Sequence, residues 1–111
     1  MKITISAFNK TRLDEVFSSI MNIASVAAMR GYIPTLKEQI EAAQRGNFWY
    51  KSITEENKIN LCAGNDYWCF LSERTETSIV LHFKARYKQD FSETMANLLI
   101  CLFPDNVKKY E

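Results

Sequence analysis

Apolar and polar residues alternate over the stretch from Thr77 to Tyr87. The odd-numbered positions from Ile79 onward are all apolar or aromatic, whereas the even-numbered positions include His82 and two basic residues. A period of two is typical of a strand that has one face against a core and the other toward solvent. We therefore predict a half-buried strand with an apolar inner face and a basic outer face.

Other segments also have strand-like patterns. Residues 2–8 place three apolar side chains on one face and polar side chains on the other. Aromatic and β-branched residues then form three short runs, at 47–51, 58–63 and 67–72, separated by polar breaks. Because these breaks are short enough for hairpins, we expect the four strands between 47 and 87 to form an antiparallel meander.

Helical spacing of apolar residues predicts three helices. The first is expected over 11–29, where a capping pattern precedes the apolar residues and Gly31 follows them. A shorter helix is expected over 35–45, again between a capping box and a glycine. The third is expected over 90–103 and ends at Pro104; its nearly continuous apolar residues predict a helix buried on most sides.

The positions of the turns set the register of the expected hairpins. We place the turns at 65–66 and 74–75, because the cross-strand pairs that these two turns imply assign the residues to the same inner and outer faces. The expected inner face consists of Phe48, Tyr50, Ile59, Leu61, Trp68, Phe70, Ile79, Leu81 and Phe83. The expected outer face consists of Trp49, Lys51, Lys58, Asn60, Cys62, Tyr67, Cys69, Val80, His82, Lys84 and Arg86.

These elements predict a single α+β domain over residues 1–111, of order βααββββα. We expect the helices to pack on one face of an antiparallel sheet. Each large inner side chain contributes about 1.5–3 kcal/mol when buried, which is sufficient for the core of one domain. Residues 105–111 are expected to form a polar C-terminal tail.

Composition and charge give little direction about function. Fourteen Lys and Arg against 13 Asp and Glu leave a formal charge of +1, so nothing draws the whole chain to nucleic acid or to a membrane. No apolar run approaches the roughly 18 residues of a membrane span. Three cysteines without a signal peptide favour a reducing cytoplasm over a disulfide framework.

No motif for catalysis or for a cofactor is found in the sequence. The three glycines are isolated, so there is no phosphate-binding loop. The spacing of Cys62 and Cys69 does not match a structural zinc site, and we expect a reduced pair, with a switchable disulfide as the alternative. His82 is the only histidine and has no acidic residue on its predicted face, although Cys69 would lie near it. We expect a protein that is not an enzyme and needs neither metal nor cofactor.

The basic and aromatic outer face is the candidate binding surface. Its predicted partner-binding residues are Trp49, Lys51, Lys58, Tyr67, His82, Lys84 and Arg86. Such residues suit the acidic surface of a protein partner, and we expect an inhibitor of the immunity or anti-defence type. The alternatives are a nucleic-acid-binding domain that uses the same face, a homodimer formed through this face or an edge strand, an ordinary solvated face, and a face partly covered by the short helix over 35–45.

Overall fold

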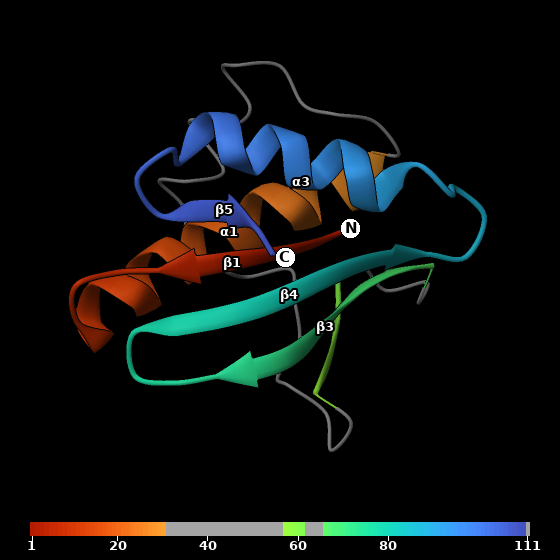
Figure 1. The fold of residues 1–111 in the computed structure, drawn as a ribbon. Helices are drawn as coiled ribbons and strands as arrows, with labels where there is room; N and C mark the ends of the chain where they lie inside the picture. The colour runs from red at the N-terminus through yellow and green to blue at the C-terminus, as the bar shows by residue number, and fades with distance from the viewer. Residues whose placement is uncertain (31–56, 62–65, 111) are drawn as a thin grey trace.

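The computed structural model describes residues 1–30, 57–61 and 66–110 (Figure 1). The elements in this part of the chain are, in order, β1 (Lys2–Ser6), α1 (Lys10–Arg30), β2 (Lys58–Asn60), β3 (Tyr67–Arg74), β4 (Ser78–Ala85), α3 (Phe91–Leu102) and β5 (Val107–Lys109). The predicted helix over 35–45 and the predicted strand over 47–51 lie outside the described residues, and so do Trp49 and Lys51.

The five described strands form one sheet in the order β2-β3-β4-β1-β5, and every neighbouring pair is antiparallel. The meander is confirmed from β2 to β4. The N-terminal strand β1 lies beside β4, with Lys2 opposite His82 and Ile5 opposite Ile79. This pairing brings the first residues of the chain onto the same sheet as the strand on which the predicted binding surface is centred.

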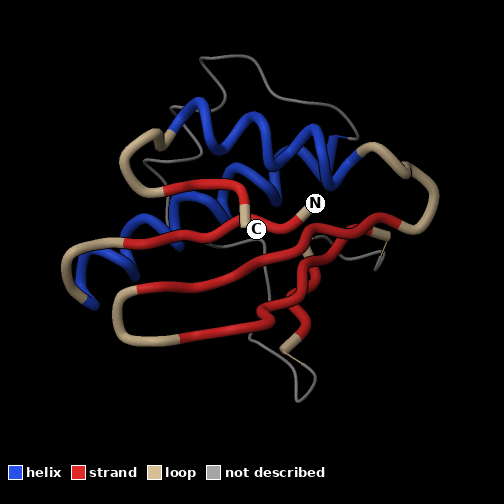
Figure 2. The backbone as a smooth tube through the Cα atoms, viewed as in Figure 1, coloured by secondary structure: helices blue, strands red, loops and turns tan. Residues whose placement is uncertain are grey.

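Both described helices cover the same face of the sheet, as predicted (Figures 1 and 2). Helix α1 begins one residue earlier than expected because Asn9 caps it, its side-chain oxygen accepting a hydrogen bond from the N–H of Arg12 at 2.8 Å. Helix α3 buries Phe91, Met95 and Leu99 against the sheet and ends shortly before Pro104. The prediction of an α+β domain with helices on one face of an antiparallel sheet is therefore confirmed for the described residues.

A single hydrophobic core fills the space between the sheet and the helices. The inner residues of β4, Ile79, Leu81 and Phe83, have no exposed surface, so the predicted inner parity is confirmed for them. Ile59 is equally buried, again as predicted. The predicted inner parity was wrong for Tyr87, which lies beyond the end of β4 and is exposed. Val80 was predicted to face outward; it lies opposite Thr4 on the outer face, yet it is also buried.

The register between β3 and β4 differs from the predicted one. Cys69 lies opposite Phe83 and Phe70 lies opposite His82, whereas the sequence pattern paired Phe70 with a residue of the inner face. Consequently Trp68 and Phe70 lie on the outer face, where Tyr67 and Cys69 were expected. The predicted faces of this strand are reversed.

The bulge in β3 explains the reversal, because the turn by itself shifts the register by an even number of residues and leaves the faces unchanged. The N–H of Thr75 donates to the carbonyl of Ser78 at 2.8 Å, which moves the turn beyond its predicted centre. A bulge between Leu71 and Glu73 adds a further residue on the β3 side. Because side chains alternate with a period of two, a shift of the register by an odd number of residues exchanges the two faces of a strand.

The register between β2 and β3 also differs from the predicted one. Ile59 lies opposite Cys69, and the N–H of Leu61 donates to the carbonyl of Tyr67 at 2.9 Å. The prediction had instead set Leu61 diagonally opposite Phe70. Both Ile59 and Leu61 still face the core, so the face assigned to these two residues was correct although their partners were not.

The polar tail predicted after Pro104 contains a strand. In β5, Val107 lies opposite Ile5 and Lys108 lies opposite Thr4, so the segment extends the sheet beyond β1. Val107 is 1% exposed, and this single apolar side chain closes the core at that edge. The described part of the chain thus ends with a strand after the last helix, which the predicted order lacks.

Candidate partner-binding face

The outer face is the side of the sheet turned away from the helices. The register assigns to it Lys2, Thr4 and Ser6 of β1, Lys58 and Asn60 of β2, Trp68, Phe70 and Glu73 of β3, Ser78, Val80, His82 and Lys84 of β4, and Lys108 of β5. Alternation along each strand produces this face, because the intervening residues are the apolar ones that fill the core.

Two aromatic residues form the centre of the outer face. Trp68 lies between Asn60 and Lys84, and Phe70 lies in the next row of the same strand. The ammonium of Lys58 lies over the Trp68 ring, 4.8 Å from its centroid, which is a favourable cation–π distance. Both aromatic side chains are half-buried. The face therefore offers apolar surface that is bordered on both sides by cations.

The charges on this face are unevenly distributed. Lys2, His82 and Lys84 gather at one end, which we call the basic end, since Lys2 lies directly opposite His82 and Lys84 follows on the same face of β4. Among the described residues of the face, Glu73 is the one carboxylate, and it lies toward the other end, opposite Val80. The prediction of a face without acidic residues was wrong for Glu73, because β3 continues to Arg74, beyond residue 72 where the predicted strand ended.

His82 has a donor in direct contact at the basic end. The amino group of Met1 lies 3.3 Å from Nε2 of His82, so a neutral imidazole can accept a hydrogen bond there. Partial burial lowers the pKa of His82, and the positive charges of Lys84, of the Met1 amino group and of Lys2 lower it further. The surroundings of His82 thus favour its neutral form.

The start of helix α3 holds Met1 in place. The Met1 amino group donates to Oγ of Ser92 at 3.0 Å, and the same hydroxyl donates to the Met1 carbonyl at 3.0 Å. These bonds join the first residue of the chain to the helix on the other side of the sheet. The geometry around His82 is therefore fixed by β1, β4 and α3 together.

Two buried polar atoms on the outer face lack a hydrogen-bond partner among the described residues. They are Nε1 of Trp68 and Oδ1 of Asn60, which belong to directly opposite residues of β3 and β2. A buried donor or acceptor without a partner is costly and uncommon in a folded protein.

The structure brings together only some of the predicted site residues. Lys58, His82 and Lys84 share the outer face as expected. Tyr67 does not, since it packs on the helix side with its ring in an edge contact with Phe91, 4.8 Å between centroids. Arg86 lies beyond the end of β4, where its Nε is 3.6 Å from a carboxylate oxygen of Asp66.

Trp68, Phe70 and Lys2 belong to the candidate site in the structure, although the sequence pattern did not assign them to it. Both parities of β3 are apolar or aromatic, so its hydrophobic pattern does not identify the inner side. Lys2 reaches the basic end only because β1 pairs with β4, far away in sequence. The sequence showed that Lys2 lies on the face opposite to Ile3 and Ile5, but it did not show that His82 is the neighbour of Lys2 across the sheet.

Cys69 is not available to His82 as a nucleophile. It is a free thiol on the inner face, fully buried, and burial raises its pKa to about 12. A thiol with so high a pKa is almost entirely protonated near neutral pH and is unreactive. The predicted proximity of Cys69 to His82 was wrong because the register places the two side chains on opposite faces. Cys62 lies outside the described residues.

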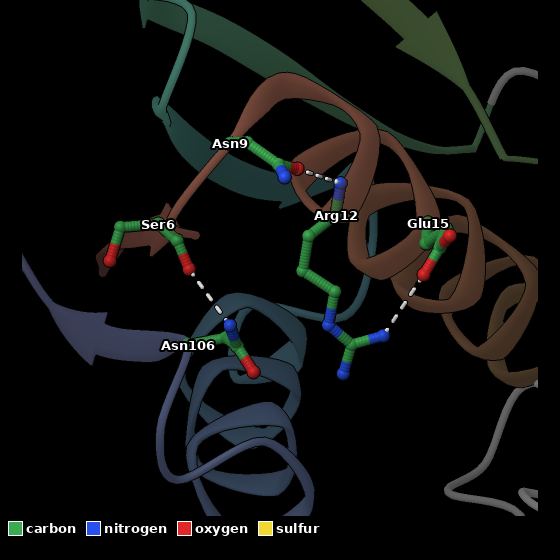
Figure 3. Close-up of polar contacts among 5 residues, drawn as sticks. All are labelled: Ser6, Asn9, Arg12, Glu15 and Asn106. Atoms are coloured by element: carbon green, nitrogen blue, oxygen red, sulfur yellow. Dashed lines mark hydrogen bonds and ion pairs between the residues drawn. The ribbon is translucent and has the colours of Figure 1, made fainter.

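A shallow pocket of about 430 Å³ lies near the other end of β1, lined by Ser6, Ala7, Phe8, Arg12, Asp105 and Asn106. Figure 3 shows that Arg12 points past the end of β1 toward Glu15, and its guanidinium donates to that carboxylate at 3.2 Å. Nδ2 of Asn106 donates to the carbonyl of Ser6 at 2.9 Å. The Asn106 bond joins the segment before β5 to the end of β1, and the Arg12–Glu15 pair lies within α1, so both contacts have structural roles.

In the part of the chain that the structure describes, no three His, Cys, Asp or Glu side chains lie together as a set of metal ligands. No described helix combines the length and the apolar character needed to cross a membrane. Comparison of the chain with protein-family models, with curated proteins and with solved structures finds no match. The outer face is therefore the feature of this protein that indicates a function.

Proposed function

We propose that this protein is a non-enzymatic binding domain that docks an acidic surface of a protein partner on its outer face. The observation that carries the proposal is the basic end, where Lys2, His82 and Lys84 border Trp68 and Phe70 on a single sheet face. Aromatic and cationic side chains are typical of the residues that dominate protein interfaces. Complementary charge on the partner would orient and accelerate the encounter.

A protein partner explains these features better than a nucleic acid does. The formal charge of the whole chain is +1, whereas nucleic-acid-binding domains are usually distinctly basic. Bases stack on aromatic rings whose faces are open, but Trp68 is half-buried and already carries the Lys58 ammonium over its ring. Partly covered aromatic groups with a cationic border suit a protein surface that adds the remaining contacts.

The proposal includes an inhibitory mode of action in a reducing compartment such as the cytoplasm. A small domain without a recognisable catalytic motif can act by covering a functional surface of its partner, as immunity and anti-defence proteins do. The free thiols of Cys69, which is buried, and Cys101, which is exposed, are consistent with a reducing environment.

Affinity capture with charge-reversed variants tests the proposal. Lys2→Glu combined with Lys84→Glu reverses the basic end, and Lys10→Glu combined with Arg74→Glu makes the same change in net charge at exposed positions elsewhere. A partner of the proposed kind is retained by the wild type and by the control pair but lost from the Lys2 and Lys84 pair. The captured protein is then purified, and its dissociation constant for each variant is measured by calorimetry.

Three results would contradict the proposal. Equal affinity of the partner for both double variants would show that the basic end is not the interface. Tight binding of a single-stranded oligonucleotide that weakens steeply with salt would favour the nucleic-acid alternative. A concentration-dependent dimer that is broken by the Lys2 and Lys84 pair would favour self-association, since the face would then be occupied by a second copy.

A further inference from the structure

The basic end gathers positive groups without a counter-ion among the described residues of the outer face. Lys2 and His82 are directly opposite each other, Lys84 follows on the same face of β4, and the Met1 amino group is 3.3 Å from His82. The carboxylate of this face, Glu73, lies toward the opposite end. The charges of Lys84, the Met1 amino group and Lys2 all act on His82, and an incoming anion would offset them.

We propose that a carboxylate of the partner is seated beside His82 in the bound state, and that protonation of His82 accompanies binding. The inference rests on the proposed function, because it specifies which chemical group of an acidic partner surface occupies the basic end. The groups that face His82 are Lys2 of β1, the Met1 amino group just before β1, Lys84 from its own strand, and the uncharged Phe70 from β3.

Proton uptake follows from the change in charge around the imidazole. In the free protein, partial burial and the cations lower the pKa of His82. A carboxylate beside the ring acts in the opposite direction, because it favours the charged form of the histidine. A group whose pKa rises on binding takes up a proton, so binding strengthens as the pH falls through the range in which His82 titrates. At higher pH the neutral ring offers the carboxylate no charge.

Nuclear magnetic resonance provides a direct test, because His82 is the only histidine and its imidazole C–H signals are unique. The probe is a hexaglutamate peptide, titrated into the full chain at about pH 6 and at about pH 8, on either side of the usual histidine pKa. We expect saturable shifts of the His82 signals, tighter binding at the lower pH, and a higher pKa of His82 with peptide than without.

Three variants make the test specific. Lys84→Gln removes one charge at the basic end and should weaken peptide binding about two- to five-fold, as expected for a partly exposed ion pair. Lys10→Gln makes the same substitution at an exposed lysine of α1 and should leave binding unchanged. His82→Gln should abolish the pH dependence while retaining the affinity seen at the higher pH.

The inference is overturned by peptide binding that does not depend on pH, by equal effects of Lys84→Gln and Lys10→Gln, or by the absence of any His82 shift. It is also overturned if inorganic phosphate alone produces the same shifts at the same concentration, since the site would then not select a carboxylate. Loss of the inference is distinguishable from loss of the proposed function. If Lys2→Glu combined with Lys84→Glu still abolishes binding of the natural partner, the proposed function holds although the inference about His82 fails.

Discussion

The two faces of the sheet differ in role: the inner face packs against the helices, and the outer face is the proposed binding surface. On the inner face, Ile79, Leu81 and Phe83 of β4 have no exposed surface and contact the helices. On the outer face, the alternate positions of the same strand carry His82 and Lys84, which are half-buried and lie beside Phe70 and Trp68. One strand thus serves both stability and, in our proposal, recognition, and its period of two keeps these roles separate.

The comparison also shows that hydrophobic character does not distinguish the faces. Trp68 and Phe70 are larger and more apolar than Cys69, yet Cys69 is the residue in the core. Large aromatic groups placed outside a core, with cations around them, retain surface that a partner can cover. Substitutions that separate the effect on folding from the effect on binding therefore provide the sharpest tests of this division.

The largest effect is expected for truncation on the inner face. Phe83→Ala removes a ring that is fully buried and in edge contact with Phe91, and should lower the free energy of unfolding by about 3–5 kcal/mol. Chemical denaturation followed by circular dichroism measures this difference. Lys84→Ala, the next residue on the outer face, should change the free energy by less than about 0.5 kcal/mol. Similar values for both variants would refute the assignment of faces.

A second variant tests the register of β3. Cys69→Ser places a hydroxyl in an apolar surrounding and should destabilise the protein by about 1–3 kcal/mol, whereas the exposed Cys101→Ser should be nearly neutral. Cys69 should also react with a thiol reagent much more slowly than Cys101 in the folded protein, which mass spectrometry of the labelled chain would detect. Rapid labelling of Cys69 would instead support the register expected from the sequence pattern.

The edge strand β5 is the subject of a third, smaller test. Val107→Ala removes two buried methyl groups and should cost about 1.5 kcal/mol, while Lys108→Ala on the outer face of the same strand should cost little. Unfolding midpoints in urea are sufficient to compare the two. If both substitutions are neutral, the segment does not contribute to the fold.

The smallest effect concerns pH. Because the pKa of His82 is lowered in the folded protein, the unfolded chain binds a proton more readily. Stability is therefore complete above the ordinary histidine pKa of 6.5, decreases as the pH falls through it, and levels off below the folded pKa. His82→Gln should flatten this part of the profile when unfolding is measured from about pH 8 to about pH 5.5, above the main range of the carboxylates. An unchanged profile would mean that His82 is not the responsible group.

Part of this fold could be predicted from residue patterns because the local signal was unambiguous. In β4 apolar and polar residues alternate except at Val80, so its inner residues and the outward direction of His82 and Lys84 followed directly. Helices α1 and α3 were predicted to within a residue or two from apolar spacing and from the residues at their ends. The periodicity of an element with one buried face can be detected in its own sequence, without knowledge of its distant contacts.

The sequence by itself therefore determined helices α1 and α3, strands β1 to β4, and the burial of Ile79, Leu81 and Phe83 in β4. Only the tertiary structure decided which side of β3 is inner, because Trp68, Cys69, Phe70 and Leu71 are all apolar and the bulge sets the register. It also decided that β5 joins the sheet and that Lys2 lies opposite His82, since both depend on contacts between the two ends of the chain. Local patterns carry no record of such long-range pairing, and the basic end exists only because of it.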